Sequence, residues 1–385
     1  MDFNLTSEQR MAVESARKMA ARDIQPVLDA HDPDTPLPKE AMKGLLQVCA
    51  GQGLTSARVP ESAGGAGIPT LLFGLMFEQI PPVVAFAIVG QEATAARIAL
   101  ESTPEQRERL LPDLISAKRI ACTGSTEPDV GSDARGIKTR VTEDGDDLVV
   151  NGDKMWITNA SICDVINITG TLGQDDQGRN QIVRVVVDRD QSPFTSSKTP
   201  CLGFCQGHLG EVHFDDCRVP KENRLGSVGD AARVLTLTWL ANRPLFGLMA
   251  VNMAQCALDA ALTYAGDRKQ FGKAIGNYQL VQELLADIET SIETSRLICY
   301  RALAAIDAGE RANGLSAQAK RYALAACQRA ISMAMEVHGS MGISRELGLE
   351  QLFRDVRMLP IPDGTNQILT LIQGRELTGV SAFRH

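Results

Sequence analysis

The periodicity of the sequence changes twice along the chain, and this order of segments constrains the fold most. Residues 1–120 carry helical patterns, residues 121–228 contain short β-branched runs separated by turn signals, and residues 229–385 return to helical patterns. Helices followed by strands and then by helices do not build an alternating βαβ sheet. We therefore predict a multi-domain α+β fold, with a helical domain at 1–120, a small β domain at 121–228 and a second helical domain at 229–385.

Local signals support the two helical regions. Thr6-Ser7-Glu8-Gln9 has the spacing of a capping box, and the glycine-rich stretch from Pro60 to Gly67 predicts a turn between helices. Two further helices are expected at roughly 316–340 and 345–358. The following residues recur on one helix face: Ile24, Val27 and Leu28 near the start, and Leu280, Val281, Leu284, Leu285, Ile288 and Ile292 in a long helix.

The middle region is predicted as strands joined by tight turns. Its β-branched runs are Leu148-Val149-Val150, Val165-Ile166-Asn167-Ile168, Ile182 to Val187, and Val212-His213-Phe214. Asp144-Gly145 and Asn151-Gly152 flank the first of these runs. Both dipeptides suit two-residue turns, so we expect a turn at each.

Composition narrows the class of protein. The chain has 39 Lys and Arg against 47 Asp and Glu, a net charge of −8 without a basic run, which argues against a nucleic-acid binder. The start, Met1 to Asn4, lacks the features of a secretory signal. The apolar segment from Pro81 to Leu100 is broken by Gln91, Glu92 and Arg97, which predicts a buried helix and no membrane span. Nine cysteines without a disulfide framework fit a reducing compartment, so we expect a cytoplasmic protein.

The sequence lacks the common nucleotide-binding motifs and a regular zinc-binding motif. Neither the G-x-G-x-x-G fingerprint after a strand nor the G-x-x-x-x-G-K-S/T loop occurs. A loose cysteine and histidine cluster has no regular zinc spacing, and we predict no metal site there. Its members are Cys201, Cys205, His208, His213 and Cys217.

Four separated motifs carry the functional signal. They are Thr126-Glu127-Pro128-Asp129-Val130-Gly131-Ser132-Asp133 with Trp156-Ile157-Thr158-Asn159; Phe214-Asp215-Asp216-Cys217-Arg218-Val219-Pro220; Arg268-Lys269-Gln270-Phe271-Gly272 with Gln279; and His338-Gly339-Ser340-Met341-Gly342, Arg354-Asp355 and Asp363-Gly364-Thr365-Asn366-Gln367. In this order and spacing the series resembles the acyl-CoA dehydrogenase family over essentially the whole chain.

The resemblance implies a helical N-terminal domain, a central β domain and a C-terminal four-helix bundle, assembled as a homotetramer that binds FAD. Ser125, Thr126, Trp156 and Thr158 would surround the flavin ring, and Ser132 would contact the pyrophosphate or the ligand. Arg268, Phe271 and Gln279 would complete the cofactor site, with Arg268 and Phe271 acting across a subunit interface. Thr365 and Gln367 would finish the dinucleotide site. Hydroxyl, N–H and Arg donors for an anion and an apolar slot for a redox ring suit these roles.

The family reaction is α,β-dehydrogenation of an acyl-CoA, in which a carboxylate removes the α-proton and the β-hydrogen leaves as hydride to the flavin. The usual base is a Glu before Gly-Thr, a position occupied here by Asp363 after Pro362. Asp is shorter by one methylene, and misplacement by about 1 Å can cost about a hundredfold in rate. The family's other base position is Asn242, which cannot serve. We predict Asp363 as the base, with a helix-start cap as its structural alternative, and Glu92 as the second candidate, whose structural alternative is an exposed carboxylate.

Other departures concern the substrate. Arg243, before Pro244, matches a family Arg that supports the ligand and the active-site loop, and Ser132, Arg243 and Gly364 are the predicted substrate contacts. Trp239-Leu240 replaces a Phe-Asp pair that often contacts CoA, so acyl carrier protein stays open as the thioester carrier, with CoA expected.

We expect a short, branched or cyclic acyl group and an electron-transferring flavoprotein as partner. The alternatives are a flavin oxidase on the same scaffold, similar to nitroalkane oxidases with their Asp base, and a non-catalytic or nucleic-acid-associated member of the family.

Overall fold

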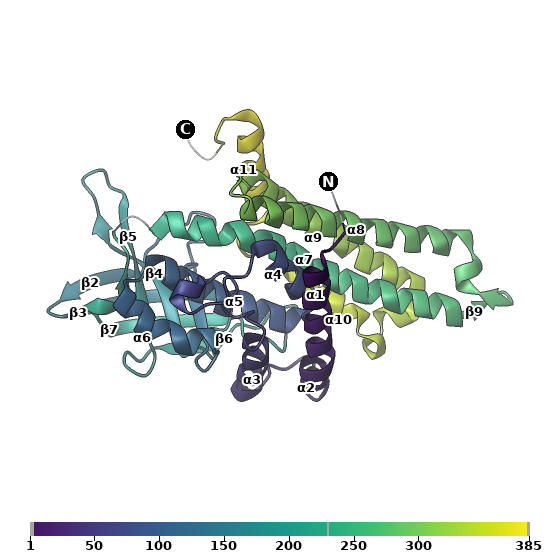
Figure 1. Ribbon diagram of the computed structural model, residues 1–385, viewed down its shortest axis with the longest axis horizontal. Helices are drawn as coiled ribbons and strands as arrows, with labels where there is room; N and C mark the ends of the chain where they lie inside the picture. The colour runs from purple at the N-terminus through teal and green to yellow at the C-terminus, as the bar shows by residue number, and fades with distance from the viewer. Residues whose placement is uncertain (1–3, 229–230, 383–385) are drawn as a thin grey trace.

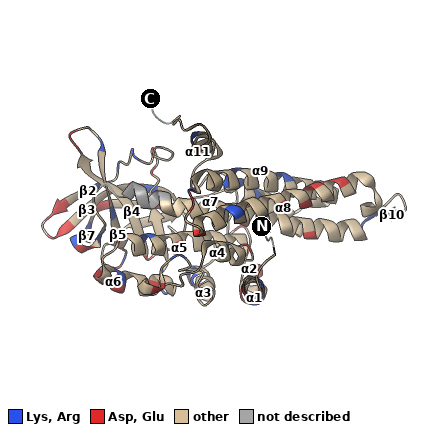
Figure 2. Cartoon of the chain, turned by 45° about the horizontal axis from the view of Figure 1, so that its top comes forward, with Lys and Arg blue, Asp and Glu red and all other residues tan. Residues whose placement is uncertain are grey.

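The computed structural model describes residues 4–228 and 231–382, with the backbone alone at 231–236. Its three regions follow the predicted order of helices, strands and helices. Figure 1 shows the β-sheet at one end of the molecule, a long helical bundle extending to the other end, and the N-terminal helices packed between them. Figure 2 shows that acidic and basic residues alternate along the sheet and the bundle.

The N-terminal helices form the middle of the molecule. The predicted capping box is present, since Thr6 Oγ1 accepts from the Gln9 amide at 3.1 Å and Gln9 Oε1 accepts from the Thr6 amide at 2.9 Å. The break from Pro60 to Gly67 is a turn, as predicted, and Gly64 adopts a φ of 82° there. The helices are α1 (Ser7–Met19), the π-helical Ala20–Ile24, α2 (Gln25–Asp29), α3 (Lys39–Ala50), α4 (Thr70–Phe77), α5 (Pro82–Glu101) and α6 (Pro104–Ile115).

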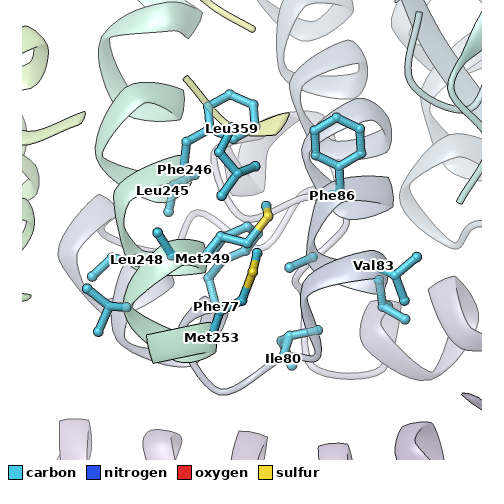
Figure 3. Close-up of a cluster of buried hydrophobic side chains, with 14 of the residues drawn as sticks. Phe77, Ile80, Val83, Phe86, Leu245, Phe246, Leu248, Met249, Met253 and Leu359 are labelled. Carbon is cyan, nitrogen blue, oxygen red and sulfur yellow. The ribbon is translucent and has the colours of Figure 1, made fainter. Parts of the chain in front are cut away.

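Helix α5 crosses the centre of the fold. Among the described residues, two helical stretches, Pro82–Glu101 and Leu237–Asp267, are long and apolar enough to cross a membrane by length and composition. The structure buries 89% and 67% of their apolar windows, as expected of core helices. Figure 3 shows the side chains of Phe86 on α5 and of Phe246 and Met249 from the bundle in one apolar cluster. This packing fixes α5 against the bundle.

The β domain is one twisted sheet with strand order β6-β7-β3-β2-β4-β5-β8, and β1 pairs with β4. Asp144-Gly145 forms the predicted turn between β2 and β3. The predicted turn at Asn151-Gly152 is wrong, because both residues lie inside β3 at a shift in its register with β7. Gly152 is needed there because a Cβ would lie 2.9 Å from Thr139 Cα. The strands are β1 (Ala121–Gly124), β2 (Arg140–Asp144), β3 (Asp147–Ile157), β4 (Val165–Gln174), β5 (Asn180–Asp188), β6 (Thr195–Lys198), β7 (Gly210–Pro220) and β8 (Arg224–Leu225).

The C-terminal region is the predicted helical bundle. Its helices are α7 (Ala231–Asp267), α8 (Gln279–Asp307), α9 (Asn313–His338), α10 (Leu349–Met358) and α11 (Asn366–Thr378), with the short hairpin β9 (Lys269–Gln270) and β10 (Lys273–Ala274) between α7 and α8. The helix expected at 345–358 begins only at Leu349, because Arg345–Leu347 is a 3₁₀ turn ended by Gly348 at a φ of 68°. The loop between α10 and α11 carries Asp363.

Candidate active site

Asp363 occupies a strained backbone position in the loop before α11. Its φ is 52°, which is uncommon for a residue other than glycine. The cap of α11 is Thr365, whose hydroxyl accepts from the Ile368 amide at 3.4 Å, so Asp363 is not the helix cap. Strained residues persist where surrounding contacts hold them, and they cluster at active sites.

Two buried cations hold the backbone of this loop. Arg243 Nε donates to the Asp363 carbonyl at 3.1 Å. Lys320 Nζ donates to the Gly364 carbonyl at 2.8 Å and also to the Pro362 carbonyl. Burial lowers the pKa of Lys320 to about 7, although the Asp363 charge acts in the opposite direction. The carbonyls on both sides of Asp363 are therefore fixed by one lysine.

The Asp363 carboxylate is oriented by an amide. Asn242 Nδ2 donates to Asp363 Oδ2 at 2.9 Å, and Asn242 Oδ1 accepts from Arg58 Nη2 at 2.8 Å. Because the arginine can only donate, it sets which end of the Asn242 amide faces Asp363. Asn242, which stands at the family's alternative base position, thus serves as a hydrogen-bond donor to Asp363.

Glu92 is buried and paired, so the expected exposed carboxylate is wrong. Its side chain is 0% exposed on α5 and accepts from Arg58 Nε at 2.9 Å and from the Arg58 amide at 2.9 Å. A carboxylate in such a bidentate pair is held by charge-assisted hydrogen bonds. Glu92 therefore anchors Arg58, whereas the Asp363 carboxylate accepts from the neutral amide of Asn242.

A second buried arginine lies next to this network. Arg97 Nε donates to Thr238 Oγ1 at 2.9 Å, and Arg58 Nη1 donates to the Thr238 carbonyl at 3.3 Å. Burial lowers the pKa of Arg97 to about 10. Thr238 and Asn242 are four residues apart on α7, so both arginines face the same stripe of that helix.

The predicted flavin-ring residues come together at one edge of the sheet. Ser125 and Thr126 follow β1, whereas Trp156 and Thr158 lie at the end of β3. The Met155 amide donates to the Thr126 carbonyl at 2.9 Å, which joins the two segments. Trp156 is 50% exposed at a φ of 62°, so a large aromatic ring is presented at this edge.

An ion pair that the sequence did not predict supports this edge. Lys154 Nζ lies 2.7 Å from Glu127 Oε1, and both side chains are buried. Burial lowers the pKa of Lys154 to about 8, and Glu127 opposes that shift. The pair fastens the loop after β1 to β3 beneath Trp156. Ser132 lies further along the same loop and is exposed.

The remaining predicted cofactor residues fall into two groups. Thr365 and Gln367 lie at the start of α11, beside Gly364. The hairpin end of the bundle holds the other three: Arg268, Phe271 and Gln279, all exposed. In Figure 1 this hairpin lies at the opposite end of the molecule from the sheet. One chain therefore does not bring these three residues to the flavin-ring group.

The cysteine and histidine cluster is divided between two places. Cys201, Cys205 and His208 line a cavity of about 290 Å³. His213 and Cys217 lie on β7, where His213 Nδ1 is 2.7 Å from Asp153 Oδ1. The described residues contain no group of three or more His, Cys, Asp or Glu side chains that could hold a metal ion. All nine cysteines are free.

Three family models match the chain in succession. They are the N-terminal domain of acyl-CoA dehydrogenase at residues 6–118, the middle domain at 122–217 and the C-terminal domain at 232–378. The three matches coincide with the helical, β and helical regions of the fold, which defines the class of the protein as an enzyme scaffold of three parts. The chain belongs to the acyl-CoA dehydrogenase family of enzymes.

Three relatives align with this chain over nearly the whole length of both sequences. A probable acyl-CoA dehydrogenase of Bacillus subtilis, YngJ, is 32% identical over 98% of this chain and 100% of its own. The cyclohex-1-ene-1-carbonyl-CoA dehydrogenase of Geobacter metallireducens is 31% identical over 97% and 99%. The glutaryl-CoA dehydrogenase of Desulfococcus multivorans is 30% identical over 99% and 99%. The last two relatives are named for different acyl groups at nearly the same identity, so identity alone does not select a substrate.

Solved structures agree on the fold. Butyryl-CoA dehydrogenase from Megasphaera elsdenii superposes with a TM-score of 0.91 at 28% identity, covering 98% of this chain and 100% of that one. PigA with FAD and proline reaches 0.91 at 25% identity, over 98% and 99%. A chain from a structure of the electron transferring flavoprotein of Acidaminococcus fermentans also reaches 0.91 at 27%, over 98% and 100%.

Three cations around Asp363 were not predicted as site residues from the sequence. Arg58, Arg97 and Lys320 come from three different elements and match none of the motifs quoted for the family. Only Arg97 gave a signal, because it interrupts an apolar helix. A charged residue in such a helix is seldom fully buried without a partner or a role.

Proposed function

We propose that this protein is an FAD-dependent dehydrogenase that introduces an α,β double bond into an acyl thioester, with Asp363 as the base. The main support is the setting of Asp363, whose backbone is held by Arg243 and Lys320 and whose carboxylate is oriented by Asn242. A base must be placed to within a fraction of an ångström, and this loop is fixed at the carbonyls on both sides of it.

The residues present fit FAD. Ser125 and Thr126 follow β1 and Thr158 follows β3, so hydroxyl-bearing residues lie on the segments next to the exposed Trp156, although Ser125 Oγ also lies 3.2 Å from Thr169 Oγ1. At the start of α11, Asn366 Oδ1 is buried with no hydrogen-bond partner among the described residues. A buried acceptor without a partner is costly, so a ligand donor would stabilise it. When bound, FAD supplies the acceptor for the hydride.

In the proposed reaction a carboxylate oxygen of Asp363 takes the α-proton of the thioester while the β-hydrogen leaves as hydride. The α and β carbons thereby lose one proton and one hydride, and a C=C bond forms. Asn242 keeps one oxygen of Asp363 in place, and Arg243 and Lys320 prevent the loop from withdrawing. Gly364 and Ser132 would contact the thioester.

Four further assignments belong to the proposal. The thioester carrier is CoA, with acyl carrier protein as the alternative, and the acyl group is short, branched or cyclic. Electrons pass to an electron-transferring flavoprotein. The enzyme works in the cytoplasm. It assembles as a homotetramer, because Arg268, Phe271 and Gln279 can reach a flavin site only from a second copy.

The first test is an anaerobic titration. Flavin-loaded protein is mixed with a panel of acyl-CoA thioesters, and the flavin absorbance is followed in the wild type, in Asp363→Asn and in Glu92→Gln. We expect bleaching by one class of thioester and a rate at least about 10³-fold lower in Asp363→Asn. Glu92→Gln should bleach with the same substrate class, since Glu92 acts only through Arg58.

Two results would change the proposal. Bleaching that survives in Asp363→Asn would place the base elsewhere. Failure of every thioester to bleach the flavin, together with rapid reoxidation by oxygen after reduction by a small substrate such as a nitroalkane, would favour the oxidase.

A further inference from the structure

The loop between β6 and β7 carries a pair of thiols that the proposed reaction does not use. Cys201 and Cys205 are four residues apart in the sequence, and both side chains are partly exposed. Both also line the cavity of about 290 Å³ described above. A small oxidant that enters this cavity would therefore meet two sulfur atoms.

The backbone of the loop brings the two cysteines back toward each other. It bends at residues 202–203, and Phe204 adopts a φ of 52°. Cys205 Sγ consequently lies 3.9 Å from the carbonyl oxygen of Cys201. Cys201 Sγ donates to the Thr199 carbonyl at 3.2 Å. A disulfide requires a distance of about 2 Å between the sulfurs, so the Cys201 side chain would leave Thr199 for another rotamer to form it.

Two cations lie beside Cys205. Arg354 Nη1 donates to Cys205 Sγ at 3.7 Å and is itself fixed by Glu350, whose Oε2 accepts from Arg354 Nε at 2.7 Å. Lys198 Nζ donates to the Cys205 carbonyl. Burial raises the pKa of the Cys201 thiol, although the Lys198 charge opposes that shift. Reactive cysteines are partly exposed and lie near positive charge, so Cys205 is placed to react first and Cys201 to follow.

The same loop joins the three regions of the chain. The Phe204 amide donates to Asp355 Oδ1 on α10 at 2.5 Å. The Gln206 carbonyl accepts from the Leu37 amide at 3.0 Å, and Gln206 Nε2 donates to the Leu28 carbonyl at 3.0 Å. A covalent bridge inside this loop would therefore act where both helical regions meet the sheet.

We propose that Cys201 and Cys205 form a redox site that hydrogen peroxide converts to a disulfide. The Cys205 sulfur attacks one peroxide oxygen, so that an S–O bond forms and the O–O bond breaks; the other oxygen leaves as water with the Cys205 proton. The Cys201 sulfur then attacks the sulfenic acid on Cys205, so that the S–S bond forms, the S–O bond breaks and a second water leaves with the Cys201 proton. The two thiols lose two electrons and the peroxide gains them. This site goes beyond the dehydrogenation and does not depend on it.

Peroxide treatment of the flavin-loaded protein tests the proposal. The protein is reduced, freed of reductant, exposed to hydrogen peroxide and alkylated, and its peptides are analysed by mass spectrometry. Cleavage after Lys198 and Glu211 gives a peptide that contains Cys201 and Cys205 as its only cysteines. We expect this peptide to lose the mass of two hydrogen atoms. Its oxidation should be at least about tenfold faster than that of Cys256, although Cys256 is the more exposed thiol.

Three variants assign the roles. Cys205→Ser should abolish the disulfide, whereas Cys201→Ser should stop at a sulfenic acid on Cys205 that dimedone captures. Cys256→Ser, the matched control on α7, should form the disulfide at the wild-type rate. Absence of the disulfide in the wild-type peptide would overturn the proposal, as would faster oxidation of Cys256, and neither comparison needs a variant. A sulfenic acid that persists on wild-type Cys205, or a disulfide to another cysteine, would also overturn it, because Cys201 would then not close the bridge.

Discussion

Lys320 is a buried cation whose partners are main-chain carbonyls on either side of Asp363. The side chain comes from α9, so it connects the Asp363 loop to the bundle. We predict that Lys320→Met lowers kcat by about 10–100-fold with little change in KM, because the base moves while the binding surface stays. Steady-state kinetics would measure this, with the exposed Lys118→Met as control. A change in KM alone would contradict a positioning role.

The same lysine predicts a pH dependence of stability. Its pKa is lowered from the ordinary 10.5 to about 7 in the fold by burial. Between pH 7 and pH 10.5 the unfolded chain therefore binds more protons at this site than the folded one, so stability rises with pH in this window. Below pH 7 both states are protonated and the effect disappears. The free energy of unfolding of the wild type should gain on that of Lys320→Met by up to about 1.4 kcal/mol per pH unit. A constant offset between pH 7 and pH 10 would refute this.

At the level of residues, the sequence predicted Asp363 and the loop-supporting Arg243, but not the other residues that hold the loop. Asp363 could be found because it follows a fixed spacing in one motif. Asn242, which bonds its carboxylate, Arg58, which bonds Asn242, and Lys320, which bonds the neighbouring carbonyls, are distant in the sequence, and only tertiary packing brings them together. The positive φ of Asp363 does have a local sequence signal, since Asp-Gly favours turns in which both residues have a positive φ.

Helix α5 is the helix through which the N-terminal region contacts the end of the sheet near Thr158. Gly90 is the point where it meets the flavin-ring edge, because a Cβ there would lie 2.9 Å from Asn159 Nδ2 and 3.2 Å from Thr158 Cγ2. Asn159 Nδ2 is itself held by the Ala87 carbonyl at 3.0 Å, so it cannot move away freely. The glycine therefore sets how closely α5 approaches Thr158.

We predict that Gly90→Ala weakens FAD binding by about tenfold, as the added methyl displaces Thr158. Gly44→Ala on α3 is the matched control, because a Cβ at Gly44 would have no atom within 4 Å. That change should stabilise the protein by up to about 1 kcal/mol through helix propensity. Fluorescence titration of FAD and thermal melts would measure both. Equal FAD affinity in the two variants would show that Thr158 does not depend on this contact.

At the level of elements, periodicity predicted type better than boundaries. The strands were predicted because runs of β-branched residues alternate with turn signals. The order of helical and β regions was predicted from the same change in periodicity. Asn151-Gly152 failed because a dipeptide typical of hairpin turns also suits a bulge where another backbone approaches closely. Whether this dipeptide forms a turn or a bulge depends on Thr139, which approaches Gly152 in the fold but is too far away in the sequence to be recognised from the neighbouring residues.

At the level of the whole molecule, the hairpin end of the bundle exposes three large apolar side chains among charged residues. Phe271 in the hairpin is 96% exposed at a φ of 49°, and Leu262 on α7 and Leu280 on α8 beside it are 51% and 75% exposed. A cluster of large exposed apolar side chains marks a surface that another protein covers. The same end carries Arg268 and Gln279, which the resemblance assigns to a cofactor site that one chain cannot complete.

We therefore predict that FAD binding and assembly are coupled through this hairpin. Phe271→Ser should shift the protein to smaller species in sedimentation velocity and weaken its FAD binding at least tenfold, with the loss of FAD reduced at high protein concentration by mass action. Met11→Ser, which removes another strongly exposed apolar side chain (73% exposed) on α1, should change neither property. If Phe271→Ser kept the wild-type assembly and FAD affinity, the hairpin would contribute nothing to a neighbouring site. If assembly were lost while FAD stayed bound, each chain would hold its flavin alone, and Arg268 would need another role.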